Sequence, residues 1–236
     1  MTTKEKMNPN KTARVAGFLS LIMIPFALFG IMWASSLIVP GDAATTANNI
    51  MASESLFRLS IGSALMVQVG HILLVLVLYK LLKVVNKNHA LLMVIFSLVG
   101  NPITMLNELN RVAVLLLLNG ADYLTVFTAG QLQSLVSLFL ALHEHGVLIA
   151  TIFWGLWLFP FGYLVFKSGF LPRILGVLLI IAGSGYLIDF ATFFLFPNFD
   201  VAINIYTGWA ELILCLWLLI KGVNVEQWEK RALESA

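Results

Sequence analysis

The sequence predicts an all-α integral membrane protein, a helical bundle with about six transmembrane helices, and three observations lead to this fold class. Of its 236 residues, 60% are hydrophobic and only 11% are charged, unlike the composition of soluble domains. The mean hydropathy is +0.93. Six apolar runs are long enough to cross the hydrocarbon core of a bilayer, which is about 30 Å thick and needs about 20 helical residues.

The six predicted spans are residues 15–39, 59–79, 90–118, 143–166, 174–196 and 202–220. With short tails at 1–13 and 222–236, they make one transmembrane domain over residues 1–236. The loop that begins at Pro40-Gly41-Asp42 is predicted to carry a short helix over residues 44–52. The first span is too long for a signal peptide and contains Pro25, so it is predicted to be an uncleaved helix. The C-terminal tail is predicted to be a frayed helical extension with Trp228 at the interface.

Residues 123–142 leave three arrangements open. Apolar residues such as Leu135 and Leu138 recur at helical spacing, while Gln131 and Ser134 face elsewhere, which is an amphipathic pattern. The segment can extend the fourth helix outward, or lie on the outer leaflet as an extra interfacial helix. It can also cross the membrane a seventh time, which would reverse the orientation of everything downstream.

The positions of the basic residues predict the orientation. Cytoplasmic loops are enriched in Lys and Arg. With six spans, every Lys and Arg except Arg58 and Arg111 falls on one side. The opposite side collects the acidic residues Asp42, Glu54, Asp122 and Asp200. Both termini are therefore expected in the cytoplasm.

Several ionisable residues lie inside the predicted spans, where they are costly and usually face the bundle interior. The third span places Asn101, Thr104, Glu108 and Arg111 on one helical face. Five ionisable residues are expected at a similar depth in the outer half of the membrane: Glu108, Arg111, His143, Asp189 and Glu211. This convergence predicts a ligand-binding pocket that faces outward. The alternative is that these groups pair with one another only to hold the helices together.

The same region raises the alternative of a metal site with His71, His143 and Asp189 as ligands. Such a metal could activate water for an intramembrane hydrolase, with Glu144 or Glu108 as the base. The spacing argues against it, because His143 and His145 lie about 200° apart on a helix and no H-E-x-x-H motif occurs. Whether the protein is an enzyme stays open.

Other classes of protein are excluded or receive no support. A net charge near +2 is too small for a nucleic-acid-binding protein. The one cysteine, Cys215, cannot form an internal disulfide and is expected to be a packing residue. The sequence has no nucleophile elbow, P-loop or dinucleotide-binding fingerprint, so the cofactor, if there is one, stays unknown.

Ordered glycine and polar landmarks run through most of the chain. They are Arg14 to Gly17, Pro40 to Asp42, Asn49-Ile50 before Phe57-Arg58, His145-Gly146, Ile152 to Leu164 and Ser168 to Gly176. This pattern resembles a bacterial multi-pass membrane family catalogued as domain of unknown function 4386. The resemblance implies an integral protein of a bacterial plasma membrane. It supplies no activity and no catalytic residues.

These observations lead to one expected function and two alternatives. We expect a multi-pass membrane protein that binds or transports a small amphiphilic molecule, with Arg111 meeting an anionic group and aromatic walls meeting the apolar part. Its surroundings are the lipid bilayer, and a homo-oligomer is compatible with the sequence. The alternatives are the metal-dependent hydrolase and a membrane sensor or scaffold without ligand chemistry.

Overall fold

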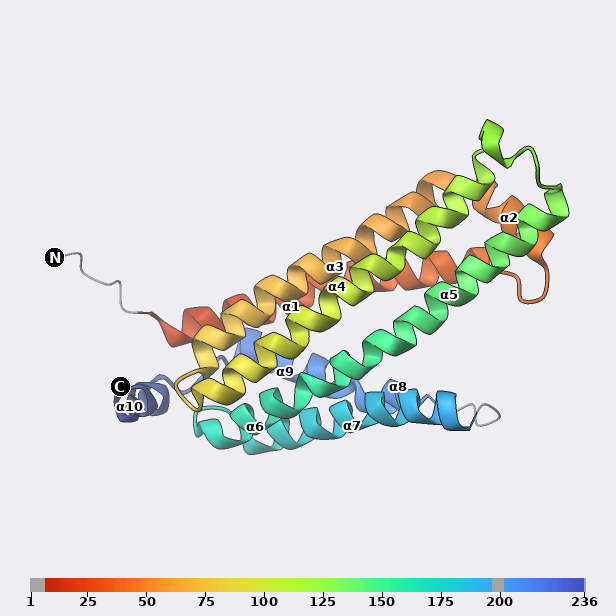
Figure 1. Cartoon of the computed structure of the whole chain (residues 1–236). Helices are drawn as coiled ribbons and strands as arrows, with labels where there is room; N and C mark the ends of the chain where they lie inside the picture. Colours follow the sequence, from red (N-terminus) through yellow and green to blue (C-terminus); the bar gives the residue numbers. More distant parts are fainter. Residues whose placement is uncertain (1–6, 197–201, 236) are drawn as a thin grey trace. The chain divides into compact units, whose positions relative to one another are not determined.

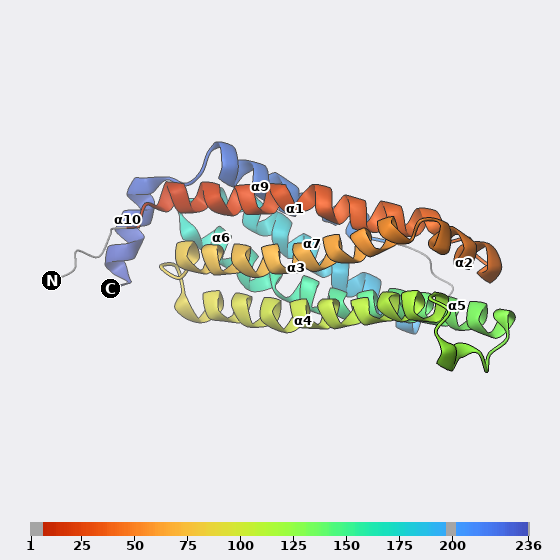
Figure 2. The same cartoon turned by 90° about the horizontal axis from the view of Figure 1, so that it is seen from above.

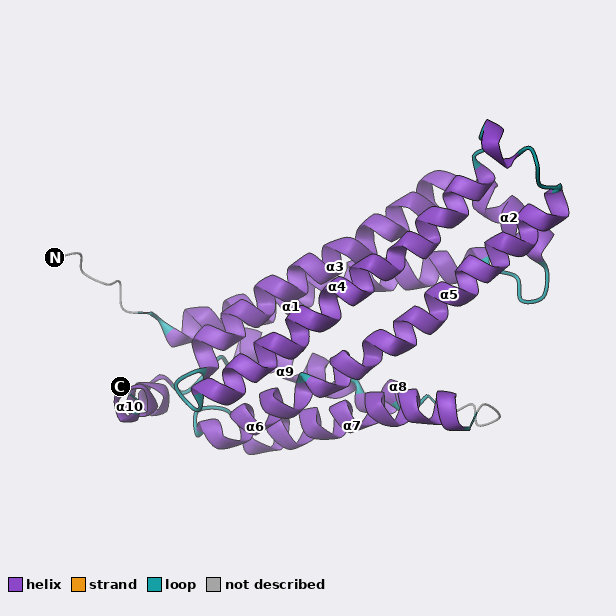
Figure 3. Cartoon of the chain, in the orientation of Figure 1, coloured by secondary structure: helices purple, strands orange, loops and turns teal. Residues whose placement is uncertain are grey.

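The chain is seen here in a computed structural model, which describes residues 7–196 and 202–235 (Figure 1). Over these two stretches it consists of helices and loops, without strands (Figure 3). The elements are α1 (Pro9–Leu37), α2 (Ala43–Ala52), α3 (Glu54–Leu82), α4 (Lys87–Leu118), the 3-10 turn η1 (Asp122–Leu124), α5 (Ala129–Leu156), α6 (Leu158–Ser168), α7 (Arg173–Leu195), α8 (Asn204–Thr207), α9 (Trp209–Ile220) and α10 (Val225–Glu234). The all-α prediction is confirmed.

Five helical segments of the described chain are long and apolar enough to cross a membrane. They are Pro9–Leu37, Glu54–Leu82, Lys87–Leu118, Ala129–Ser168 and Arg173–Leu195. Asn204–Ile220 adds a sixth only when it is taken together with α10, from which it is bent by 101°. The count of five to six agrees with the predicted bundle. The short helix expected in the first loop is α2.

The fourth span is longer than its predicted range of 143–166. Residues 129–142 belong to the same continuous helix as 143–156, so the segment extends the fourth helix and forms neither a separate interfacial helix nor a seventh crossing. The physical reason is that no glycine or proline interrupts the chain between Gln131 and His145. The 28 residues of α5 span about 42 Å at 1.5 Å per residue, more than the hydrocarbon thickness of about 30 Å.

The fourth span is also interrupted, at Trp157, between α5 and α6. Pro160 has no backbone N–H, and its ring crowds the carbonyl one turn earlier, which belongs to Leu156. The helix is broken at this carbonyl, and on either side Trp157 N donates to Phe153 O at 3.1 Å and Phe161 N donates to Trp157 O at 3.3 Å. The interruption therefore lies one turn before the proline.

The chain divides into two compact units. Unit 1 comprises the described residues of Met1–Ile22, Gly70–Gly100 and Thr151–Ala236, and unit 2 comprises Met23–Val69 and Asn101–Ala150. The boundaries fall inside α1, α3, α4 and α5. The units are therefore not domains joined by linkers, and a single transmembrane domain over residues 1–236 stays a prediction.

Unit 2 has an apolar core to which four helices contribute. Its buried members are Ile50 of α2, Phe57 and Ile61 of α3, Val114 and Leu115 of α4, and Val136 of α5. Leu37, at the end of α1, packs against the same cluster. The helix α2 also completes the end of α1, since Asn49 Nδ2 donates to Leu37 O at 3.2 Å. This bond satisfies one of the carbonyls that a helix C-terminus leaves unpaired.

Unit 1 contains a close helix pair, α6 and α7, which lie side by side in both views (Figures 1 and 2). A Cβ atom at Gly162 would lie 2.6 Å from the carbonyl oxygen of Gly176. Because backbone cannot move away as a flexible side chain can, only glycine allows this approach. Small residues at helix interfaces are the usual means of close packing in membranes.

The C-terminal helix α10 is anchored within unit 1. Trp228 is buried, and its Nε1 donates to Leu81 O at the end of α3 at 2.9 Å. Arg231 Nη2 donates to Lys167 O at 3.1 Å. The chain reverses at Gly222, whose φ is +68°, and Asn224 accepts from Gln227 N to cap the helix. The tail is helical, as expected, but side-chain and backbone bonds hold this helix in place and do not leave it frayed.

Candidate functional site

Glu108 and Arg111 of α4 form a buried ion pair in unit 2. Arg111 Nη1 lies 3.2 Å from Glu108 Oε2, and only 4% and 7% of the two side chains are exposed. Residues three apart lie on the same helical face, and such pairing was the sequence-based alternative to a ligand pocket. Charges removed from water need such a partner, because an unpaired buried charge is very costly.

His143 brings α5 to the same carboxylate. Its Nε2 lies 3.1 Å from Glu108 Oε1, and 21% of the His143 side chain is exposed. Both oxygens of Glu108 are therefore engaged, one by each partner. The structure thus brings together three of the five predicted site residues, from two helices.

Arg111 has further partners on α3. Its Nη2 donates to Ser60 Oγ, and Ser60 in turn donates to Phe57 O at 2.7 Å. The guanidinium carbon lies 4.9 Å from the centre of the Phe57 ring, within the range of a cation–π contact. Sequence spacing could not reveal these contacts, because they depend on the register between α3 and α4.

Two asparagines complete the group. Asn107 Nδ2 donates to His143 O at 2.8 Å, and Asn110 Nδ2 donates to Asn107 Oδ1 at 2.9 Å. Gly146 leaves room for Asn107, because a Cβ atom there would overlap its amide. We refer to the six residues joined in this way as the Glu108 cluster: Ser60, Asn107, Glu108, Asn110, Arg111 and His143.

The other two predicted site residues belong to unit 1 and have partners there. Asp189 of α7 accepts from the backbone N–H of Ile203 at 2.7 Å and of Asn204 at 2.8 Å. Its carboxylate therefore accepts hydrogen bonds from backbone N–H groups at the start of α8, where an acidic group is favourable. Glu211 of α9 accepts from the Tyr186 hydroxyl at 3.3 Å.

The alternative metal site would draw its ligands from both units, His71 and Asp189 from unit 1 and His143 from unit 2. Within the described residues, no group of three or more His, Cys, Asp or Glu side chains could hold a metal ion. His71 instead lies edge-on to Trp157, with 4.8 Å between ring centres, and 3.3 Å from Ser97 Oγ. Each of His71, His143 and Asp189 has other contacts, and this set stays an alternative drawn from the sequence. Asp189 binds backbone N–H groups, which leaves its carboxylate already satisfied.

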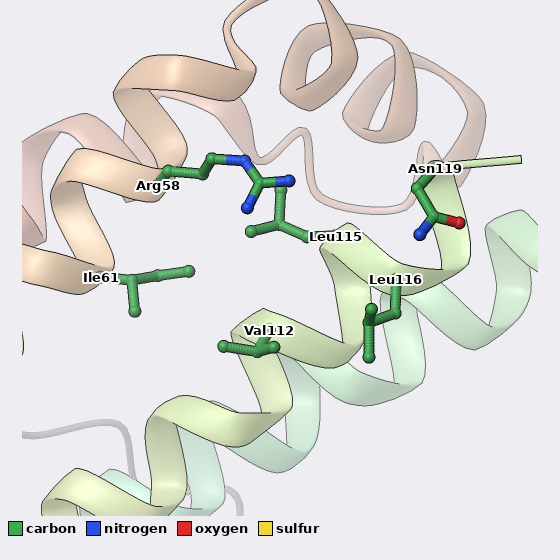
Figure 4. Close-up of a pocket in the computed structure, with 6 residues that line it drawn as sticks. All are labelled: Arg58, Ile61, Val112, Leu115, Leu116 and Asn119. Atoms are coloured by element: carbon green, nitrogen blue, oxygen red, sulfur yellow. The ribbon is translucent and has the colours of Figure 1, made fainter. Parts of the chain in front are cut away.

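A cavity that the sequence did not predict lies between α3 and α4 in unit 2 (Figure 4). Its volume is about 180 Å³. Its lining residues are Arg58, Ile61, Val112, Leu115, Leu116 and Asn119. Arg58 is paired with Glu54 at 2.7 Å, and both side chains are more than half exposed. The one signal in the sequence was that Arg58, unlike most cations, falls on the acidic side of the predicted bundle.

Comparison with known proteins identifies a family without an assigned activity. The family described as Domain of unknown function (DUF4386) matches residues 15–222. An uncharacterized protein of Archaeoglobus fulgidus is 32% identical over 152 residues, which cover 64% of this chain and 75% of the relative. No solved structure matches. Since that relative is archaeal, family membership does not by itself indicate a bacterial membrane. The chain belongs to the DUF4386 family, and with its apolar helices it is a multi-pass membrane protein.

Proposed function

We propose that the protein binds or transports a small amphiphilic molecule in unit 2, in the cavity between α3 and α4. The observation that carries this proposal is the composition of the cavity wall. Four aliphatic side chains line it, and one guanidinium and one amide join them. Pockets for small molecules combine mostly apolar walls with a few polar groups that orient the ligand.

Arg58 is better suited than Arg111 to meet the anionic group of such a ligand. The Arg58–Glu54 pair is exposed, and exposed pairs contribute only about 0.2–1 kcal/mol, so a ligand can displace Glu54 easily. The Arg111–Glu108 pair is buried, and breaking a buried pair costs about 3–5 kcal/mol. Arg111 therefore holds the helices around the pocket in place, and Arg58 is the arginine that contacts the ligand.

The Glu108 cluster serves this pocket by holding its walls. Ser60 and Ile61 are neighbours on α3, and Arg111 and Val112 are neighbours on α4. The hydrogen bond from Arg111 to Ser60 therefore sets the register of the two helices next to the cavity. Asp189 and Glu211 are not required by this proposal, because their bonds lie within unit 1.

We also propose that both termini are cytoplasmic and that the cavity opens toward the outer side. The support is the distribution of Lys and Arg described above, since short cytoplasmic loops are enriched in them. Arg58 lies near the start of α3 and Asn119 just after α4, on the side that collects the acidic loops.

The test uses the full chain in detergent and alkanoates of increasing length as probes, with the alcohols of the same length as controls. An alkanoate should raise the unfolding temperature of the parent by binding the native state, and the alcohol should do so less. Arg58→Gln should abolish this difference. Glu54→Gln should strengthen alkanoate binding by up to about fivefold, because it frees Arg58 from a pair worth at most about 1 kcal/mol.

The two variants remove the same ion pair, so a loss of stability common to both is separated from an effect on binding. An alkanoate response that is unchanged in Arg58→Gln would overturn the proposal. A response lost equally in Glu54→Gln would also contradict it, because the ion pair and not the guanidinium would then matter.

A scaffold without ligand chemistry is the second candidate, and one observation favours it. Both carboxylate oxygens of Glu108 are engaged by protein partners, which is what a purely structural polar cluster requires. A protein that no alkanoate or alcohol stabilises, in the parent or in Glu54→Gln, would favour this candidate.

A further inference from the structure

A second pocket lies in unit 1, beside the first turns of α1. Its volume is about 430 Å³. The polar part of its lining is Asn8, Asn10, Lys11 and Arg14, and the apolar part is Val15, Phe18 and Leu219. The lining of the pocket therefore changes from cationic to apolar along the axis of α1.

Lys11 and Arg14 leave their charge available to a ligand. Both are exposed, and among the residues that the structure describes neither has a carboxylate at ion-pair distance. The first turn of α1 contains no acidic residue. The partial positive charge of the helix N-terminus therefore adds to the two cations.

The two asparagines are oriented to donate. Asn8 Oδ1 accepts from Lys11 N at 3.0 Å, as a helix cap does. Asn10 Oδ1 accepts from Val223 N at 3.3 Å, in the turn between α9 and α10. Because each amide oxygen is already used, the group that each asparagine can present to a ligand is its NH₂. Cations and amide donors together favour an anion with several acceptor oxygens.

The apolar part of the pocket defines the rest of the ligand. Lys11, Arg14, Val15 and Phe18 follow one another at helical spacing and are all exposed, so they share one face. Phe18 lies seven residues beyond Lys11, about 10 Å along the helix. This matches the step from the headgroup level of a bilayer to the upper part of its acyl chains. A free anion would leave the apolar part unused.

We propose that this pocket is a binding site for a phospholipid with a net negative charge. Lys11, Arg14 and the two asparagine amides hold the phosphate, and an acyl chain lies along Val15, Phe18 and Leu219. Basic pockets next to membrane helices are suited to anionic headgroups. The site is independent of the cavity between α3 and α4, because its lining comes from unit 1 alone.

The experiment measures thermal unfolding of the full chain in an uncharged detergent, with dioctanoyl phosphatidylglycerol, dioctanoyl phosphatidylcholine or inorganic phosphate added. Phosphatidylglycerol should raise the unfolding temperature of the parent more than the other two probes. Lys11→Gln/Arg14→Gln should weaken phosphatidylglycerol binding roughly thirtyfold, since each cation near the surface contributes about 1 kcal/mol.

Lys80→Gln/Lys83→Gln is the matched control. It removes two exposed cations with the same spacing, Lys80 at the end of α3 and Lys83 just after it, also in unit 1, and should bind phosphatidylglycerol like the parent. Lys11→Arg/Arg14→Lys keeps both charges and should retain binding, so a loss of binding can be separated from a failure to fold. Phe18→Ala should reduce the gain in affinity that a longer acyl chain provides.

Three results would overturn the proposal. If both Gln double variants lose binding equally, the attraction is a general effect of surface charge. If inorganic phosphate stabilises the parent as well as phosphatidylglycerol does, the pocket takes a free anion. If phosphatidylcholine is equally effective, the net charge of the lipid is not recognised.

Discussion

At the scale of single residues, the two arginines of unit 2 differ in what surrounds them. Arg111 contacts Glu108, Ser60 and the Phe57 ring, and it is almost fully buried. Arg58 has one carboxylate partner on its own helix, and 58% of its side chain is exposed. The same side chain is therefore a structural element in one place and an accessible cation in the other.

The first variant to examine is Arg111→Met, which leaves the Glu108 carboxylate buried with His143 as its remaining ionisable partner. We expect a loss of about 3–5 kcal/mol in unfolding free energy, because a buried charge loses its main compensation. Glu108→Gln/Arg111→Met should recover most of this loss, since no charge then stays behind. Chemical unfolding of the purified chain in detergent measures both.

The exposed pair of unit 2 provides the control for this comparison. Removing Arg58 and Glu54 together should change the unfolding free energy by no more than about 1 kcal/mol. If Arg111→Met and the Glu108/Arg111 double variant unfold alike, the cluster does not depend on charge compensation.

At the scale of elements, the short helix α2 shows what the landmark residues of the first loop do. Gly41 has a φ of +77° and turns the chain, Asp42 caps α2, Asn49 bonds the last residue of α1, and Ile50 lies in the core of unit 2. These residues were part of the resemblance to the family. Their contacts explain them as features of the fold.

The cap of α2 should be sensitive to acid. Hydrogen bonds from the Thr45 hydroxyl and then from its backbone N–H hold the pKa of Asp42 below its ordinary value of 3.8. A carboxylate whose folded pKa is lowered stabilises the fold above the unfolded pKa, and this contribution is lost as the pH falls through the folded pKa. We therefore expect the amide resonance of Thr45 in NMR spectra to shift with a midpoint below pH 3.8.

Asp42→Asn is the control for this titration, because a neutral amide oxygen can still accept from the Thr45 backbone but cannot be protonated in this range. Its Thr45 amide should show no such transition. A midpoint in the parent above the ordinary value of Asp would contradict the observed bonds.

At the scale of the whole molecule, hydropathy predicted which segments form long helices, because a run of about 20 apolar residues is needed to cross a bilayer. Helical spacing placed Glu108 and Arg111 on one face, and their pairing was the alternative to a ligand pocket, since residues three apart share a helix face. The cavity between α3 and α4 could not be predicted, because it depends on how side chains of two helices fill their interface. The anchoring of α10 could not be predicted either, because the indole of Trp228 donates to a carbonyl that is far away in the sequence.

The orientation can be tested by labelling single cysteines in intact cells. The native Cys215 is buried, so a Cys215→Ala background should give little signal. Cysteines at Asn48 and Tyr123 should react with a membrane-impermeant maleimide from outside, whereas cysteines at Lys87 and Lys221 should react only after permeabilisation. All four positions are exposed in the structure. Labelling of Asn48 and Lys87 from the same side would contradict six spans with cytoplasmic termini.

The bond between Trp228 and Leu81 also has a consequence for biosynthesis. The two residues are separated by 147 positions, so when α3 leaves the ribosome the carbonyl that it presents at its end still lacks this partner. The bond can form only after Trp228 has been made. A product truncated before α10 would therefore keep an unsatisfied carbonyl at the end of α3, and this defect distinguishes it from a chain that includes α10.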